Sequence, residues 1–244
     1  MQREEYHKMA GVEDAMWYYR ALHRHVIRSL ASRLPATGAR VLDAGCGTGG
    51  LLRRLHEARP LWSLTGLDLS PLACELARER TGGEVVQGSI AALPFPAGTF
   101  DAVVSCDVAC QVTDPVLALR EFNRGLKPGG VLVLTMPAYQ WMYSYHDRAV
   151  GNLRRYRRGE VNALVRAAGL GVAHSTYWNT LPFPLAVLRR KMLPPPAAPA
   201  SDVRRFPPPL EAGFNGLMAL EHAWLGRGGR LPFGNSVLTV AIKS

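Results

Sequence analysis

The chain has 244 residues, of which 48% are apolar, enough for one domain with a substantial buried core. No apolar run reaches the roughly 18 to 20 residues that span a bilayer, and residues 1–5 are too polar for a secretory signal, so we expect a cytoplasmic protein without stable membrane insertion. The net charge of +10 favours an anionic small-molecule partner, whereas the dispersed basic residues and the lack of a recognised RNA or DNA module argue against nucleic acid.

Strands and helices alternate along most of the chain. Short apolar runs predict strands, and apolar residues at helical spacing predict helices. Helices are expected over residues 14–33, 49–58, 71–80, 115–125, 160–168 and 211–225, and strands over residues 40–44, 62–67, 84–87, 101–106, 130–136, 170–177 and 236–242. This alternation predicts an α/β fold in which helices cover both faces of a parallel sheet.

Two segments near the C-terminus interrupt the alternation. Residues 194–209 are rich in proline and are expected to form an extended loop, which either covers a site or only connects elements on the surface. Residues 181–193 combine an apolar stretch with three consecutive cations, Arg189 to Lys191. They form either a helix packed on the domain with a solvated basic end, or a peripheral contact with an anionic membrane.

A glycine-rich turn joins the first predicted strand to a helix. Its residues are Gly45-Cys46-Gly47-Thr48-Gly49. Glycine permits positive φ and a close approach of ligand to backbone, and the free amides at the start of the helix are donors for a polar or negative group. The turn therefore predicts a nucleotide-cofactor site.

Two carboxylates flank this turn. Asp43 lies two positions before the first glycine, and Asp68 ends the second predicted strand, where a βαβ unit places the acid that binds ribose hydroxyls. With Gly50 in third place, the glycines also approach the dinucleotide fingerprint G-x-G-x-x-G. Asp43 would repel a pyrophosphate and attract a cationic group. Asp68 suits the ribose of NAD and that of another nucleoside cofactor equally well.

Four sequence blocks in order carry a family resemblance. They are residues 41–49, Gly66-Leu67-Asp68-Leu69-Ser70, Leu93-Pro94-Phe95 with Phe100-Asp101, and Leu126-Lys127-Pro128-Gly129-Gly130. This set resembles the class I S-adenosylmethionine (SAM)-dependent methyltransferases, in the type 11 group that includes the ubiquinone and menaquinone biosynthesis enzymes. Outside these blocks, Trp141, His146-Asp147, Gly151 and Arg154-Arg155-Tyr156 resemble a bacterial subgroup of that family.

The resemblance implies a Rossmann-like sheet of seven strands, mostly parallel, with the last strand antiparallel. It implies a single SAM-binding domain over residues 1–244, with an N-terminal helical lid (1–35), a cofactor-binding core (38–137) and acceptor-side elements (138–244). The cofactor would be SAM, with no metal. The four cysteines contain no C-x-x-C pair, so free thiols are expected in preference to disulfides or zinc ligands.

The resemblance also implies a set of cofactor-binding residues. In the core they are Asp43, Gly45, Cys46, Gly47, Gly49, Asp68, Leu69, Ser89, Ile90, Cys106 and Gln111. Two positions depart from the family pattern. Ser89 stands where relatives commonly have an acid that contacts the adenine amino group, and Cys110-Gln111 stands where many have Glu-His. Gln111 is therefore expected to position a group by hydrogen bonding and not to transfer protons.

The N-terminal segment is rich in aromatic residues. In related enzymes such a segment folds over the cofactor, so Tyr18 is expected to contact SAM, Arg20 its methionine carboxylate, and Trp17 the acceptor. The alternative is that these aromatics only anchor the core.

The basic segment at residues 139–158 follows the fifth predicted strand and is expected to lie over the open side of the pocket. His146 and Asp147 are the candidate catalytic bases, and the alternative is that they hold the loop together. The candidate acceptor-binding residues are Tyr143, Tyr145, Arg154, Arg155 and Tyr156. An arginine here can clamp an anionic acceptor or can simply be solvated or paired with an acid such as Glu13.

The predicted function is methyl transfer from SAM to a small, anionic or aromatic acceptor by direct displacement at the sulfonium methyl. Two alternatives remain. One is a SAM-binding protein that does not transfer methyl, such as an enzyme that cyclises or rearranges its substrate, and the other is an NAD-dependent oxidoreductase on the same fold.

Overall fold

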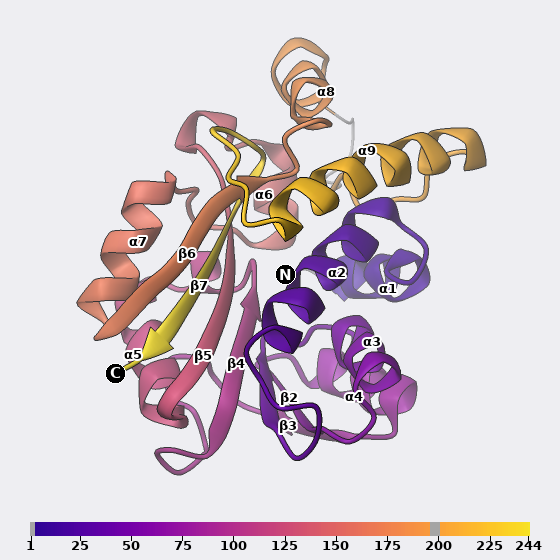
Figure 1. Ribbon diagram of the computed structural model, residues 1–244. Coiled ribbons are helices and arrows are strands. Elements are labelled where there is room, and N and C mark those ends of the chain that lie inside the picture. The colour runs from indigo at the N-terminus through magenta and orange to yellow at the C-terminus, as the bar shows by residue number, and fades with distance from the viewer. Residues whose placement is uncertain (1–2, 196–200) are drawn as a thin grey trace.

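A twisted sheet of seven strands forms the centre of the molecule, in a computed structural model that describes residues 3–195 and 201–244 (Figure 1). The strands are β1 (Arg40–Ala44), β2 (Ser63–Asp68), β3 (Glu84–Gln87), β4 (Phe100–Cys106), β5 (Leu126–Pro137), β6 (Leu170–Trp178) and β7 (Ser236–Lys243). Their order in the sheet is β3-β2-β1-β4-β5-β7-β6. β7 runs antiparallel to both of its neighbours, β5 and β6, and the other paired strands are parallel, so the predicted fold class is confirmed.

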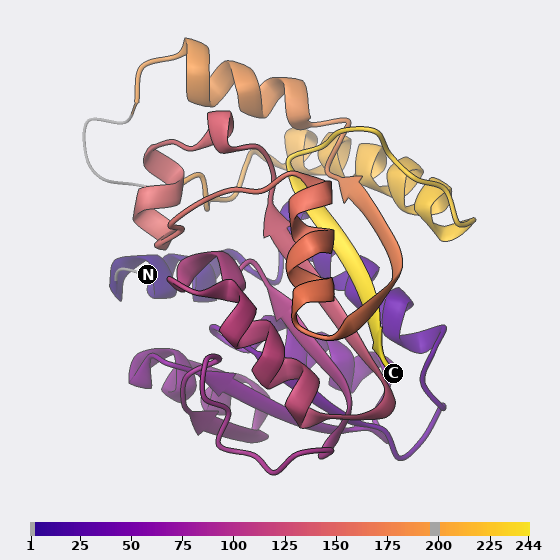
Figure 2. The same ribbon diagram turned by 90° about the vertical axis from the view of Figure 1, so that its left-hand side faces the viewer.

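The helices cover both faces of this sheet. They are α1 (Arg3–Val12), α2 (Trp17–Ala31), α3 (Gly50–Ala58), α4 (Pro71–Thr81), α5 (Pro115–Gly125), α6 (Tyr145–Val150), α7 (Arg158–Ala167), α8 (Phe183–Val187) and α9 (Pro208–Gly226). Three single turns, η1 (Ala109–Gln111), η2 (Gln140–Met142) and the π-helical η3 (Leu188–Met192), complete the described elements. In Figures 1 and 2, α5 and α7 lie on one face of the sheet and α2, α3 and α4 on the other.

Alternation along the central strands divides the core into two layers. On β5, Val131 and Val133 pack in the cluster with α2 and α3, whereas Leu132 and Leu134 pack in the cluster with α5 and α7. Successive side chains of a strand point to opposite faces, so a strand buried on both sides is apolar at every position. This explains the continuous apolar run that identified this strand in the sequence.

Local capping sets where several helices begin and end. The Ser70 hydroxyl accepts a hydrogen bond from the Ala73 amide at the start of α4, and the Asp114 carboxylate accepts two backbone amides at the start of α5. A proline follows each cap at the first helical position, where the missing N–H costs nothing. Both starts follow strand ends, so capping also helps to shape the edge of the sheet that carries the site.

Two helices, α1 and α6, were not predicted as separate elements, whereas α8 lies within residues 181–193, for which a packed helix was one of the two expectations. The proline-rich segment also differs from the prediction, because α9 begins at Pro208 and takes two of its prolines into the first helical turn. Residues 196–200 of that segment lie outside the described residues. Across the described part of the chain, no helix combines the length and the hydropathy that crossing a bilayer requires.

Candidate functional site

The glycine turn between β1 and α3 is packed too closely for side chains. Gly45, Gly47 and Gly49 all have positive φ, at 92°, 53° and 80°. A Cβ placed on Gly45 would lie 2.4 Å from Val108 Cγ2, and one placed on Gly47 would lie 2.6 Å from Met9 Cε. The turn is thus enclosed by α1 on one side and by the segment after β4 on the other, with its backbone facing a cavity.

Asp68, at the carboxyl end of β2, is tied to this turn. One of its oxygens accepts the Gly47 amide at 3.0 Å, and the other accepts the Ser70 amide at 2.9 Å. The Tyr6 hydroxyl of α1 lies 3.5 Å from the second oxygen. Burial raises the pKa of Asp68, and the two backbone amides oppose that shift. The carboxylate also lines the cavity, where it offers acceptor positions for a pair of ribose hydroxyls.

Asp43 is a buried carboxyl group at the floor of the cavity. Its residue is 2% exposed, and no side-chain hydrogen bond from the described residues reaches it. Burial, with smaller contributions from Glu13 and Asp68, raises the pKa of Asp43 to about 8. A group of this kind favours a cationic ligand, because a nearby positive charge would stabilise its ionised form.

These residues line one cavity of about 690 Å³ at the carboxyl ends of the parallel strands. In an open α/β sheet this edge is where ligands bind. One part of the cavity reaches Asp68, Leu69, Ser89 and Ile90, past the ends of β2 and β3. The lining also includes Cys106, His146 and residues within 182–190 and 202–206, in the C-terminal part of the chain. We call the part of the cavity beside Asp68, Leu69, Ser89 and Ile90 the inner compartment, and the part beside residues 182–190 and 202–206 the outer compartment.

Asp107 also lines the cavity and was not among the predicted site residues. It follows the last residue of β4 and has a φ of 57°, an unusual value for a residue other than glycine. Its carboxylate accepts hydrogen bonds from the Tyr18 hydroxyl at 2.7 Å and from the Thr135 hydroxyl at 3.1 Å. Burial raises the pKa of Asp107, and these two hydroxyls oppose the shift. Its position directly after a predicted strand, at the ligand-binding ends of the sheet, was the sequence signal that could have identified it.

His146 lines the cavity as a neutral imidazole. Its Nδ1 accepts the Asp202 amide at 3.1 Å. Burial and the neighbouring Arg190 lower the pKa of His146 to about 3, opposed by Asp202 and Asp147. The ring is therefore uncharged at neutral pH and a weak base.

Asp147 is not among the cavity-lining residues, and this position contradicts its prediction as a catalytic base. It is fully buried, and its carboxylate accepts hydrogen bonds from the Ser144 amide, from Asn152 Nδ2 and from Arg155 Nε at 2.8 Å. Burial alone would raise the pKa of Asp147, but Arg155 and Asn152 hold it below its usual value. The alternative, that Asp147 holds the loop together, describes this geometry.

Arg155 completes that ion pair. It is 4% exposed, and it also donates to the Ala138 carbonyl at 3.1 Å. It touches the cavity, but its guanidinium is engaged with protein groups. Arg154 instead points outward and donates to the Thr113 carbonyl. The structure thus separates the two arginines that the sequence presented as a pair.

Several other predicted contacts lie away from the cavity lining. Arg20 is exposed on α2, on the side that faces a second, smaller depression. The Tyr143 hydroxyl donates to the Asn152 carbonyl, and the Tyr145 hydroxyl donates to Asp202. Tyr156 is buried beside a bridge to Ala138, and Gly49 serves as the left-handed N-cap of α3. These residues support the walls of the site and are not among those that line it.

The remaining predicted residues do line the cavity. They are Trp17, Tyr18, Cys46, Leu69, Ser89, Ile90, Cys106 and Gln111, together with Asp43, Gly45, Gly47 and Asp68. The Gln111 amide donates to the Asp107 carbonyl at 3.1 Å and lies 3.5 Å from Asn152 Oδ1. This side chain therefore positions neighbours by hydrogen bonding.

A buried polar cluster joins the N-terminal helices to the glycine turn. Glu13, between α1 and α2, accepts the Thr48 hydroxyl at 2.5 Å and pairs with Arg80 of α4 at 2.7 Å. Arg80 also donates to the Ala10 carbonyl at the end of α1. Burial raises the pKa of Glu13, whereas Thr48 and Arg80 lower it. The cluster holds α1 against the turn, where Tyr6 and Met9 line the cavity.

The charges around the turn discriminate between cofactors. Asp43, Asp68 and Glu13 bring three carboxyl groups to its surroundings, and among the described residues only Glu13 is paired with a cation. A pyrophosphate here would face net negative charge, whereas a ligand with a ribose and a positive charge would satisfy both Asp68 and Asp43. These carboxyl groups fit SAM, which carries ribose hydroxyls, an ammonium group and a sulfonium.

Comparison with known proteins agrees with this fit. Residues 42–134 match the family model described as "Methyltransferase domain". Demethylmenaquinone methyltransferase of Staphylococcus aureus (strain JH9) is 35% identical over 124 residues, which cover 46% of this chain and 52% of the relative. The chain thus spans about half the length of the curated relatives it matches, over the part that holds the glycine turn.

Solved structures extend the likeness over nearly the whole chain. One structure shows a methyltransferase of Haloferax volcanii in complex with the Trm112 methyltransferase activator. It is 25% identical, with a TM-score of 0.64 over 98% of this chain and 96% of that one. Geranyl diphosphate methyltransferase in complex with SAM has the same fold, at 16% identity and a TM-score of 0.64 over 92% and 85% of the two chains. Residues 42–134 are therefore a methyltransferase domain, and the described chain has the fold of the class I SAM-dependent methyltransferases.

Proposed function

We propose that this protein transfers a methyl group from SAM to a small molecule with an apolar body, an anionic group, and a hydroxyl or amine as the acceptor atom. The observation that carries this proposal is the continuity of one cavity, from Asp68 past Asp107 to an outer compartment. Methyl donor and acceptor must meet in line, and a single connected cavity permits this.

The inner compartment would hold the cofactor. Asp68 would accept the two ribose hydroxyls, and Ile90 would pack against the adenine. Ser89, already an acceptor for the Ala91 amide, offers adenine a neutral partner in place of an acid. Asp43 would face the positively charged methionine portion. When bound, SAM supplies an electrophilic methyl group on a sulfonium.

The outer compartment suits an apolar, negatively charged acceptor. Phe206, Phe214 and Leu185 contribute apolar surface to it. Arg189, Arg190 and Arg204 also line it, and Arg190 pairs with Asp202 at 2.7 Å. Two arginines thus remain without a described carboxylate partner there. A guanidinium binds carboxylates and phosphates in two-point fashion, so this end of the acceptor would carry the anionic group.

Asp107 and Tyr18 would act at the acceptor atom. The bond formed joins the acceptor oxygen or nitrogen to the methyl carbon, the bond broken joins that carbon to sulfur, and the acceptor proton passes to the Asp107 carboxylate. The raised pKa of Asp107 makes it a better proton acceptor than a solvated aspartate, and better than His146, whose pKa is about 3. Alignment of the two reactants can supply most of the catalysis, about 7 to 11 kcal/mol.

The N-terminal helices would close the inner compartment. Tyr6, Met9 and Tyr18 come from α1 and α2, and all three line the cavity. The Glu13 cluster ties these helices to the turn that binds the cofactor. The N-terminal helices and the glycine turn would therefore become ordered together when the cofactor binds.

Calorimetry with S-adenosylhomocysteine (SAH) and SAM tests the cofactor assignment. The wild type should bind both, and Asp68→Ala should weaken binding at least about tenfold, because hydrogen bonds to a charged group contribute roughly 1.5 to 3 kcal/mol each. Asp101→Ala is the matched control and should not weaken binding. The Asp101 carboxylate pairs with Lys127 at the start of β4, at the opposite end of the strands from the cavity. Binding of NAD but not SAM would overturn the assignment.

A second assay tests methyl transfer itself. Incubation with methyl-labelled SAM and a panel of phenolic, carboxylate and phosphate-bearing apolar acceptors should yield SAH and labelled product. SAM that binds without SAH formation, while an acceptor is converted to an isomer, would instead support a SAM-binding cyclase or isomerase. Cys110-Gln111, which stands in place of the Glu-His pair of many relatives, is the reason to test that alternative.

A further inference from the structure

Helix α9 has two apolar faces, and only one of them packs on the protein. Its inner face, with Phe214 and Met218, joins the core cluster of α2. Its outer face exposes Leu210, Leu217, Leu220 and Trp224, at 53%, 36%, 67% and 56% exposure. Alanine, glycine and proline occupy its other exposed positions, so no exposed position of this fully described helix carries a charge. A solvated helix normally presents charged residues on its outer face.

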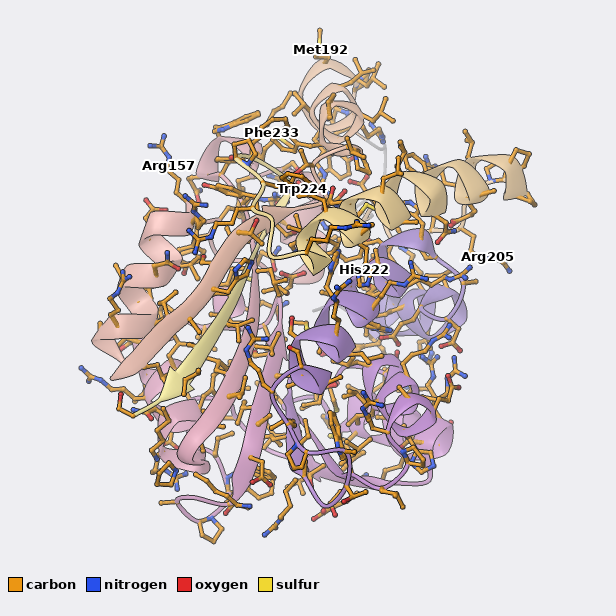
Figure 3. The ribbon with its side chains drawn as sticks, viewed as in Figure 1. Arg157, Met192, Arg205, His222, Trp224 and Phe233 are labelled. Atoms are coloured by element: carbon orange, nitrogen blue, oxygen red, sulfur yellow. The ribbon has the colours of Figure 1, made fainter. Side chains whose placement is uncertain are left out.

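The segment formed by α8 and η3 exposes a second group of large apolar side chains. Leu185, Leu188, Met192 and Leu193 are all exposed, with Met192 at 73%. Figures 1 and 2 show α8 as the uppermost element with α9 below it, and Figure 3 places Met192 at the upper tip of the molecule. We call the exposed residues of α8, η3 and α9 together the apolar cap.

The charge around the apolar cap is strongly positive. Residues 181–234 contain seven arginines or lysines and three acids. All three acids are engaged: Asp202 with Arg190, Glu211 with the Trp17 and Phe206 amides, and Glu221 with the Asn179 and Thr180 amides. The cap therefore presents apolar surface and cations to its surroundings.

The cap also borders the mouth of the cavity. Leu185 is half exposed to solvent and lines the cavity at the same time. Arg189 and Arg204, beside it in the cavity lining, stack their guanidinium groups on Tyr145 and Phe206. If α8 rests on a surface, a molecule that leaves this surface beside α8 would enter the outer compartment directly.

We propose that the apolar cap binds the surface of a membrane that contains anionic lipids, with the leucines and Trp224 in the headgroup region and the arginines on the lipid phosphates. Exposed apolar surface of this kind marks an interaction site, and cations beside it favour an anionic lipid surface. A second copy of the chain fits less well, because two caps would bring their positive charges together. This surface stands on exposed residues and is independent of the proposed methyl transfer.

Vesicle sedimentation with purified protein tests the proposal. Vesicles of phosphatidylcholine with phosphatidylglycerol should sediment the protein, vesicles of phosphatidylcholine alone should not, and added salt should release it because the charges are screened. The double variant Leu188→Glu with Leu220→Glu places one acid on each part of the cap. It should weaken binding to the anionic vesicles at least about tenfold, since each change removes an apolar side chain that would insert into the membrane and adds a negative charge that the lipid phosphates repel.

The matched control is Leu61→Glu with Leu117→Glu, which alters two exposed leucines outside the cap and changes the net charge equally. It should bind vesicles like the wild type, and both variants should keep the wild-type melting temperature and SAH affinity. The proposal is overturned if the wild type fails to bind anionic vesicles, or if the control loses as much binding as the cap variant. A wild-type dimer that the cap variant converts to a monomer, without vesicle binding, would assign the cap to a second copy.

Discussion

The Tyr18 hydroxyl donates a 2.7 Å hydrogen bond to the carboxylate of Asp107. Tyr18 belongs to the second helix of the chain and Asp107 follows the fourth strand, 89 residues later. The bond links the N-terminal helices to a cavity-lining residue that directly follows β4. The position of the N-terminal helices and the ionisation of Asp107 are therefore physically coupled.

Substitution of Asp107 tests its role as the proton acceptor. Asp107→Asn should lower kcat by about 100-fold or more, because a positioned base contributes about 10² to 10⁴ in rate. The SAM dissociation constant should change by less than about threefold, since the carboxylate lies beyond the ribose site. A variant with unchanged kcat would exclude Asp107 as the base.

Tyr18→Phe removes a hydrogen bond that stabilises the ionised form of Asp107. The pKa of Asp107 should rise further, so the acidic limb of the pH profile of kcat/KM should move to higher pH. Tyr19→Phe is the control, because its ring contacts Tyr18 and makes no hydrogen bond to Asp107. Equal shifts in both variants would contradict the assignment.

Gly45→Ala should disable the cofactor turn. Its φ of 92° disfavours any side chain, and the added methyl group would lie 2.4 Å from Val108. Gly38→Ala separates these effects, because Gly38 has a φ of 76° and open space around it. Gly38→Ala should cost only about 1 to 2 kcal/mol of unfolding free energy, whereas Gly45→Ala should cost more and abolish SAH binding. Urea denaturation and calorimetry measure the two quantities.

SAM affinity should rise with pH through the neutral range. Burial raises the pKa of Asp43 to about 8, so this carboxyl is mostly protonated below pH 8 in the free protein. A cationic ligand favours the ionised form, so binding releases a proton and becomes tighter as pH increases, by up to about tenfold per pH unit. Calorimetry between pH 6 and 7.5 in buffers of different ionisation enthalpy should detect this proton. Asp43→Asn should remove the dependence, and an equal slope in that variant would assign it to another group.

The ion pair between Arg155 and Asp147 should contribute to stability and not to catalysis. Both side chains are almost fully buried. Arg155→Met leaves Asp147 as an unpaired buried charge and should lower the unfolding free energy by about 3 to 5 kcal/mol. The double variant with Asp147→Asn should recover much of this loss. Where both variants remain folded, kcat should stay within about threefold of the wild type, and a large loss in the double variant would restore a catalytic role.

Local sequence determined the cofactor half of the site. Strand, glycine turn and helix at residues 40–58 depend on interactions between near neighbours, and Asp68 follows from the repeat of a βαβ unit. Short apolar runs also predicted all seven strands, most clearly β5, because a strand buried on two faces is continuously apolar. The short helices α1 and α6 were not predicted as separate elements, since six to ten residues hold too little periodicity to identify.

Only the tertiary structure decided which charged residues meet the ligand. His146-Asp147 and Arg154-Arg155 look equivalent as neighbouring pairs, but the fold turns Asp147 and Arg155 toward each other in the interior and places His146 on the cavity. The carboxylate of Asp107 is held by Tyr18 and Thr135, which are remote in the sequence. Burial and long-range partners set the pKa of a side chain and its access to a ligand, and neither quantity is encoded in local sequence.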